Sequence, residues 1–271
     1  MDQKFNKSRL FIGSCFALLV TSLTFAMRAK IEEIFGPVED GGIFGLSKEA
    51  IGWAFSPAFW GFTIAMVVGG FIIDIVKTKT LVWAAFVLQL IGAVIFILAQ
   101  NKEMLFLANV FIGLGNGSVE ASLNPLVATL YPKNKTKMLN RFHVWFPGGI
   151  LIGSLLAYFM MDKMAITWQV YAGLLFIPLA IYGFLFFGQK IPETERVTSG
   201  VTYRGMLKAI GAPYTIITSM TLMILLAINL FTLPEGWMYL ALIGIVSVIS
   251  IAEAKFIHGE SIIFPVMFTL M

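Results

Sequence analysis

The chemistry that this sequence could perform centres on a few polar residues inside long apolar stretches. Glu120 is the only charged residue between Glu103 and Lys133. An ionised carboxylate is costly in such surroundings, so Glu120 could be a group that takes up and releases a proton. Asn116 and Asn124, four residues before and after it, would share its helix face. That face could line a polar cavity; alternatively, the carboxyl group could only bond a neighbouring helix.

Two further polar side chains lie where apolar stretches meet polar segments. His143 could bind a polar solute or relay a proton, because histidine changes charge near physiological pH. The alternative is a histidine at the membrane surface. Arg28 follows the first apolar stretch and could contact the same solute or only extend its head to the lipid headgroups. Pro125, directly after Asn124, interrupts helix hydrogen bonding, as occurs both near membrane-protein cavities and in ordinary transmembrane helices.

A third group of residues could form a gate at the end of the second apolar stretch. Gly70, Asp74, Lys77 and Lys79 form the pattern Gly-x-x-x-Asp-x-x-Lys-x-Lys. A carboxylate there can accept hydrogen bonds from a helix N-terminus or from a cationic side chain. Such a contact can hold two helices together until they move apart. The alternative is a solvated helix end beside lysines.

Other chemistry is excluded by what the sequence lacks. A single cysteine, Cys15, rules out an internal disulfide framework, and two isolated histidines make a zinc site improbable, so no metal or cofactor is expected. No Ser/His pair or paired-Asp motif at helical spacing supports an intramembrane enzyme. The net charge of +4 could suggest nucleic acid, but the basic residues lie in short loops between apolar stretches, which membrane topology explains better.

The elements that must position these residues are transmembrane helices. The chain of 271 residues is 58% hydrophobic and only 13% charged, with a mean hydropathy of +0.87, and soluble proteins carry about twice that charge. A spanning helix needs about 20 mostly apolar residues. The sequence therefore predicts an all-α, multi-pass transmembrane helical bundle with about eight helices, over residues 10–27, 51–73, 80–100, 104–131, 142–161, 164–189, 209–233 and 236–252.

The spacing of these helices predicts the organisation of the chain. Residues 1–189 would form a six-helix bundle, 190–208 a basic cytoplasmic linker, and 209–271 a partial second bundle of about two helices and a tail. Basic residues accumulate in cytoplasmic loops. An inside N-terminus, in the cell (inner) membrane, places all but five of the 19 Lys and Arg residues on the cytoplasmic side, the five being Arg28, Lys30, Lys48, Lys102 and Lys163.

With these residues identified, the chain resembles the major facilitator superfamily. The segment 70–79 is similar to its loop 2–3 signature, with Asp74 retained and with Lys77 and Thr78 in place of the central Gly and first Arg. Within the superfamily, the chain is most similar to the fucose:proton symporter group. Glu120, Asn124 and Pro125 match that group's Glu-x-x-x-Asn-Pro element in the fourth helix.

The same group carries Leu-Asn-x-x-Gln-x-Phe-Asn-x-x-Gly at the start of its fifth helix. Leu139, Asn140 and Gly149 match this pattern, whereas His143 replaces the Gln and Phe146 the second Asn. The change at Phe146 indicates a related small polar solute in place of fucose. The group's first-helix acid has no clear counterpart, since Arg28 and Lys30 occupy that region, with Glu32 further on.

The resemblance implies a site and a function. Glu120 would carry the proton, and His143 and Asn124 would face the sugar. Members have twelve helices in two halves with the site between them, so this chain would be a truncated or partial transporter: a proton-coupled symporter of a small polar, sugar-like organic solute. Its partners would be the solute, protons, the lipid bilayer and, for a partial chain, a second chain completing the bundle. The alternative is a non-transporting membrane remnant or interaction module with the same half-fold.

Overall fold

The structure, a computed structural model, describes residues 5–38, 42 and 44–202, and these residues form helices and turns without a strand. The all-α class predicted from the sequence is therefore confirmed. The chain divides into two compact units, residues 1–198 and 199–271, and the helices described below belong to the first. The helices expected at 209–233 and 236–252 lie outside the described residues, so the linker and the partial second bundle stay predictions.

Six spans in the described residues are long and apolar enough to cross a membrane: Lys7–Phe35, Lys48–Val76, Thr78–Ile97, Lys102–Leu130, Lys135–Lys163 and Trp168–Phe186. Three of them are single helices, α1 (Lys7–Phe35), α4 (Thr78–Ile97) and α5 (Lys102–Leu130). The others are interrupted: α2 (Lys48–Phe55) and α3 (Pro57–Val76); α6 (Lys135–His143), α7 (Trp145–Ala157) and the π-helix η2 (Tyr158–Lys163); and α8 (Trp168–Gly173) and α9 (Phe176–Phe186). A short α10 (Glu195–Thr198) follows.

Local sequence explains where several helices begin. Asn6 caps α1 by accepting from the Arg9 backbone N–H at 3.1 Å, and Asn101 caps α5 by accepting from Met104 at 2.8 Å. Such caps satisfy backbone donors that the first helical turn leaves free. Pro57 at the first position of α3 accounts for the break after α2, because proline lacks the N–H that would continue the hydrogen-bond ladder. Lys77, with φ of 68°, forms the one-residue turn between α3 and α4.

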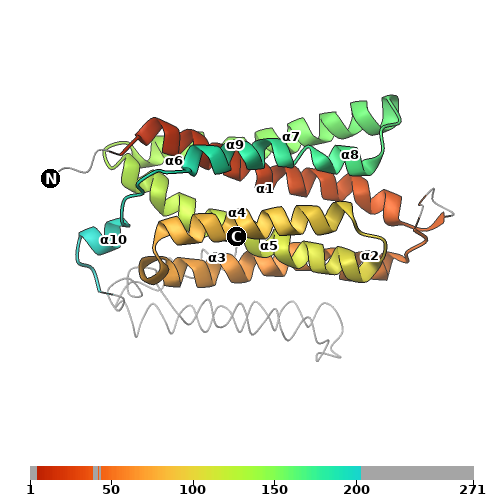
Figure 1. The fold of residues 1–271 in the computed structure, drawn as a ribbon, viewed down its shortest axis with the longest axis horizontal. Helices are drawn as coiled ribbons and strands as arrows, with labels where there is room; N and C mark the ends of the chain where they lie inside the picture. Colours follow the sequence, from red (N-terminus) through yellow and green to blue (C-terminus); the bar gives the residue numbers. More distant parts are fainter. Residues whose placement is uncertain (1–4, 39–41, 43, 203–271) are drawn as a thin grey trace, which may run out of the picture. The chain divides into compact units, whose positions relative to one another are not determined.

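The six spans pack as two groups (Figure 1). Helices α3 and α4 lie against α5, and α7 and α9 lie against α1. The two groups meet along α1 and α5, which are the most buried spans, each with 67% of its apolar window inside the bundle. The residues expected to carry chemistry on α1 and α5 are thus held at the centre of the bundle.

Glycines allow α3 and α5 to pack closely. A Cβ atom on Gly113 would lie 2.4 Å from the Pro57 carbonyl oxygen, and one on Gly117 would lie 2.2 Å from that of Phe62. Both distances are too short for any side chain. The absence of a side chain at these two positions therefore lets α3 approach α5 closely.

An arginine ties the first span to the sixth. Arg9, near the start of α1, donates to the backbone carbonyls of Leu185 at 2.9 Å and Phe184 at 2.8 Å. Carbonyl groups in the last turn of a helix have no partner within the helix, so the guanidinium supplies donors that α9 lacks. We call the end of the bundle where α1 begins and α9 ends the N-terminal end.

Candidate functional site

The most distinctive polar group in the spans is a carboxylate paired with a neutral amide. Glu120 on α5 is 8% exposed. Asn124, one turn later, donates its amide N–H to Glu120 Oε2 at 2.7 Å. This is the only hydrogen bond to the Glu120 side chain in the described part of the chain, and no described cation forms an ion pair with the carboxylate. The Asn124 Oδ1 atom is buried and has no hydrogen-bond partner among the residues that the structure describes. The pair can therefore bind something more, whether a proton or a polar ligand.

His143 lies near this pair without bonding to it. It is the last residue of α6, it is exposed, and its ring packs beside that of Phe142 with centroids 5.1 Å apart. Helix α6 packs against α5, the helix that carries Glu120.

Asn116 belongs to a different group from Glu120 and Asn124, although all three are on α5. Its Oδ1 accepts from Gln89 at 2.9 Å, and its Nδ2 donates to the Thr24 hydroxyl at 2.9 Å. Tyr182 in turn donates its hydroxyl to Gln89 Oε1 at 2.8 Å. This buried network joins α1, α4, α5 and α9.

Gln89 and Tyr182 were not among the residues singled out from the sequence. A signal for Gln89 was present, because it is the only strongly polar residue between Leu81 and Ala99. No comparable signal pointed to Tyr182, since a tyrosine in a span is as readily explained by packing.

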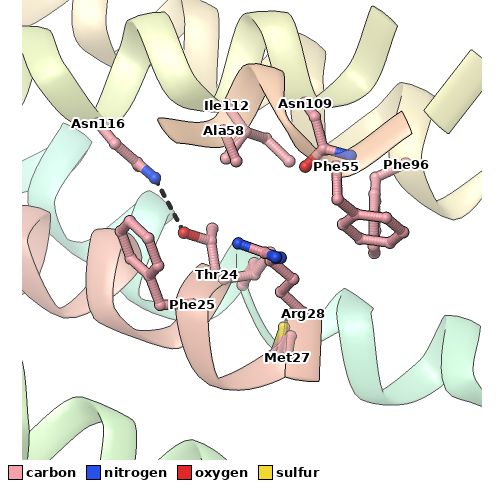
Figure 2. Close-up of a pocket in the computed structure, with 11 residues that line it drawn as sticks. Thr24, Phe25, Met27, Arg28, Phe55, Ala58, Phe96, Asn109, Ile112 and Asn116 are labelled. Atoms are coloured by element: carbon pink, nitrogen blue, oxygen red, sulfur yellow. Dashed lines mark hydrogen bonds between the residues drawn. The ribbon is translucent and has the colours of Figure 1, made fainter. Parts of the chain in front are cut away.

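A small cavity opens beside this network (Figure 2). Its volume is about 20 Å³, which is room for roughly one water molecule. Arg28 from α1 extends into the space between α1 and α5, where Asn116 bonds Thr24. The other lining residues are mostly apolar: Phe25, Met27, Phe55, Ala58, Phe96, Asn109, Ile112 and Leu175. The cavity thus brings together two predicted solute-binding residues, Arg28 and Asn116, but is too small for a sugar.

The charge of Arg28 is balanced locally. Its Nε lies 2.5 Å from Glu32 Oε1, one turn along α1, and its guanidinium lies 4.1 Å from the ring centroid of Phe59. These contacts hold the side chain inside the bundle, so Arg28 does not simply extend to the lipid headgroups. An anionic group on a solute would compete with Glu32 for the guanidinium.

The predicted gate residues are at the N-terminal end of the bundle, away from this cavity. The Asp74 side chain is only 4% exposed and forms an ion pair with Arg196. It also accepts a hydrogen bond from the Thr194 hydroxyl. A solvated helix end, the alternative considered from the sequence, does not describe Asp74. Its cationic partner comes from α10, more than a hundred residues later, and not from the neighbouring Lys77.

The other two gate residues are differently placed. Lys77 is exposed and shapes the turn between α3 and α4. A Cβ on Gly70 would meet nothing within 4 Å, so no described neighbour requires glycine there. A second ion pair supports the strap formed by residues 190–198, because Lys135 Nζ on α6 lies 2.6 Å from Glu195 Oε1. The strap therefore joins α3 to α6.

No group of three or more His, Cys, Asp or Glu side chains that could hold a metal ion occurs among the described residues.

Comparison with known proteins places this geometry in a family. The family model of the Major Facilitator Superfamily matches residues 10–257 of this chain. No significant match exists among curated proteins. Among solved structures, the fold is similar to a glutamate-to-glutamine variant of the peptide transporter POT, with a TM-score of 0.55 and 18% identity, over 88% of this chain and 50% of that one.

Two related structures give the same result. The sulfate complex of that variant has a TM-score of 0.53 at 20% identity, over 88% of this chain and 50% of the other. The POT transporter in complex with sulfate has a TM-score of 0.52 at 20% identity, over 89% of this chain and 50% of the other. The chain thus spans half the length of these transporters, and at such identities the likeness concerns the fold alone. Because the family match extends over most of the sequence, the chain belongs to the Major Facilitator Superfamily, a family of multi-pass membrane transporters and not of enzymes.

Proposed function

We propose that this chain provides the N-terminal six-helix bundle of a proton-coupled secondary transporter for a small polar, sugar-like solute. It would lie in the cell membrane with its N-terminus in the cytoplasm, as the distribution of Lys and Arg predicts. The observation that carries the proposal is the pairing of Glu120 with the neutral Asn124 inside α5.

A carboxylate without a bonded cation is suited to exchange protons. Protonation removes its charge, and the cost of holding that charge in a span changes as the site opens to either side of the membrane. The ionised form accepts the Asn124 N–H that the structure shows. The protonated form could donate its O–H to Asn124 Oδ1 after the side-chain amide flips, and no other described group bonds that oxygen. Asn124 can thus serve both protonation states.

The solute would bind next to this pair. The resemblance to the fucose:proton symporter group suggests Asn124 and His143 as its ligands, and Arg28 and Asn116 line the neighbouring cavity. That cavity holds about one water molecule, so a sugar needs further space. The family resemblance suggests where the space lies, since members bind solute between two six-helix halves.

The Asp74–Arg196 ion pair would act as the gate. It is nearly buried, it joins the end of α3 to α10, and breaking it would free the strap of residues 190–198 from α3. Alternating access requires such contacts to form and break. Gly70 and Lys77 would assist by shaping the same helix end.

The test uses the protein that contains this chain, reconstituted in vesicles and supplied with a panel of radiolabelled hexoses and pentoses. Glu120→Gln mimics the protonated carboxyl group permanently. It should abolish accumulation driven by a pH gradient while preserving exchange of labelled for unlabelled solute. Glu103→Gln, at the exposed start of α5, is the matched control and should behave like the parent protein.

Two outcomes would contradict the proposal. If Glu120→Gln still accumulates solute against a gradient driven by pH, the coupling acid lies elsewhere, and Glu32 is the next candidate. If the parent protein neither accumulates nor exchanges any solute of the panel, the alternative of a non-transporting membrane module is favoured.

A further inference from the structure

A groove at the N-terminal end of the bundle gathers lysines that form no ion pair with the acidic residues of the described part of the chain. It lies among the start of α1, the α3–α4 turn, the end of α5 and residues 188–198, and its volume is about 1180 Å³. Four exposed lysines line it: Lys7, Lys77, Lys79 and Lys190. None of the four forms an ion pair within the described ranges.

The acidic residues of the groove do not balance these charges. Asp74 is already neutralised by Arg196. Glu193 is the other lining carboxylate and stands outside the ion pairs of the described residues. Four cations therefore face one free carboxylate around a single hollow, which gives the groove a positive potential. The start of α4 at Thr78 has no capping side chain and opens on the same groove, adding a smaller positive contribution.

Membrane topology explains why this end of the bundle is basic, but not why these lysines converge. Lys133 and Lys137 lie at the same end, are also exposed, and do not line the groove. A general excess of basic residues on this side of the membrane would favour lysines inside and outside the groove alike. The convergence on one cavity of four cations that have no described ion-pair partner instead indicates a ligand that carries concentrated negative charge.

We propose that this groove binds a phosphate-bearing anion. Ammonium groups are effective phosphate partners, and basic pockets at the ends of transmembrane helices hold anionic lipid headgroups. The phosphate could belong to such a headgroup or to a soluble compound. Each lysine near the bound anion contributes about fivefold to affinity, so removal of two should weaken binding roughly 30-fold.

The experiment titrates the purified full chain in a neutral detergent and measures adducts by native mass spectrometry. The probes are dioctanoyl phosphatidylglycerol, dioctanoyl phosphatidylcholine and inorganic phosphate. Lys79→Gln/Lys190→Gln removes two groove cations, and Lys133→Gln/Lys137→Gln removes two cations outside it. Thermal unfolding without probe should be the same for both variants. If the groove variant is less stable, Lys190→Gln alone should still lose about fivefold in affinity.

The parent and the control variant should bind phosphatidylglycerol equally, and the groove variant roughly 30-fold more weakly. Displacement of phosphatidylglycerol by inorganic phosphate would identify the phosphate group itself as the ligand, and a failure to displace it would assign the site to lipid headgroups. Equal weakening by the groove and control variants, or equal affinity for phosphatidylcholine and phosphatidylglycerol, would overturn the proposal.

Discussion

Replacement of Gln89 by leucine tests whether the buried polar network holds the spans together. Gln89 is 2% exposed. It donates to Asn116 at 2.9 Å and accepts from Tyr182 at 2.8 Å, and a weaker contact to Thr21 is 3.4 Å long. Leucine has a similar size, so the change removes the hydrogen bonds while leaving little cavity. Tyr182 would retain a buried hydroxyl without an acceptor.

The expected cost follows from the two short bonds. Hydrogen bonds between transmembrane helices contribute about 0.6 kcal/mol on average and at most about 1.7 kcal/mol. Gln89→Leu should therefore lower the free energy of unfolding by about 1 to 3 kcal/mol. Tyr182→Phe removes only the 2.8 Å bond and should cost about half as much. The double variant should cost less than the sum, because neither partner is then left unpaired.

The assay is equilibrium unfolding in mixed micelles with increasing sodium dodecyl sulfate, followed by tryptophan fluorescence. Gln100→Leu, at an exposed position beyond the end of α4, is the control and should leave the midpoint unchanged. Strictly additive costs for Gln89→Leu and Tyr182→Phe would refute the idea that the two side chains stabilise the bundle through their mutual hydrogen bond.

Three further predictions concern packing, the gate and topology. Gly117→Ala should destabilise the bundle by about 1 to 3 kcal/mol in the same assay, because its Cβ has no room, whereas Gly52→Ala, with open space around it, should not. Asp74→Asn should speed backbone amide hydrogen exchange across residues 190–198. The charge swap Asp74→Arg with Arg196→Asp should restore much of the protection against exchange. Unchanged exchange in Asp74→Asn would show that the ion pair does not hold the strap. In a Cys15→Ala background, Lys48→Cys should react with an impermeant reagent added outside cells and Lys133→Cys should not; the reverse pattern would invert the proposed orientation.

Hydropathy was sufficient to predict the spans, because the requirement for about 20 apolar residues acts on each segment independently. All six apolar stretches before residue 190 correspond to spans in the structure. Their internal breaks were harder to foresee. The stretches 51–73 and 142–161 read as continuous helices, yet the first is interrupted before Pro57, and the second becomes π-helical from Tyr158.

Contacts within one helix were also predictable. Asn124 bonds Glu120 at the four-residue spacing expected on a helix face. The Arg28–Glu32 pair has the same spacing, so the sequence contains the signal for this ion pair as well.

Partners distant in sequence could not be derived from one chain. Asp74 finds its cation in Arg196, although Lys77 is far closer along the chain. Asn116 lies on the face of Glu120 but bonds Gln89 and Thr24 on other helices. These pairings are decided by how the spans pack, and a helical periodicity does not specify which neighbour a polar side chain meets.

The contact between Arg9 and the end of α9 has a consequence for biosynthesis. The carbonyl groups of Phe184 and Leu185 are translated about 175 residues after the guanidinium that bonds them. During synthesis Arg9 therefore lacks these two acceptors until the sixth span has been inserted. The first helix can enter the bilayer early, but it cannot reach its final position against α9 until that time. Closure of the bundle is thus a late event, because the start of the first span gains these two bonds only after the end of α9 has been made.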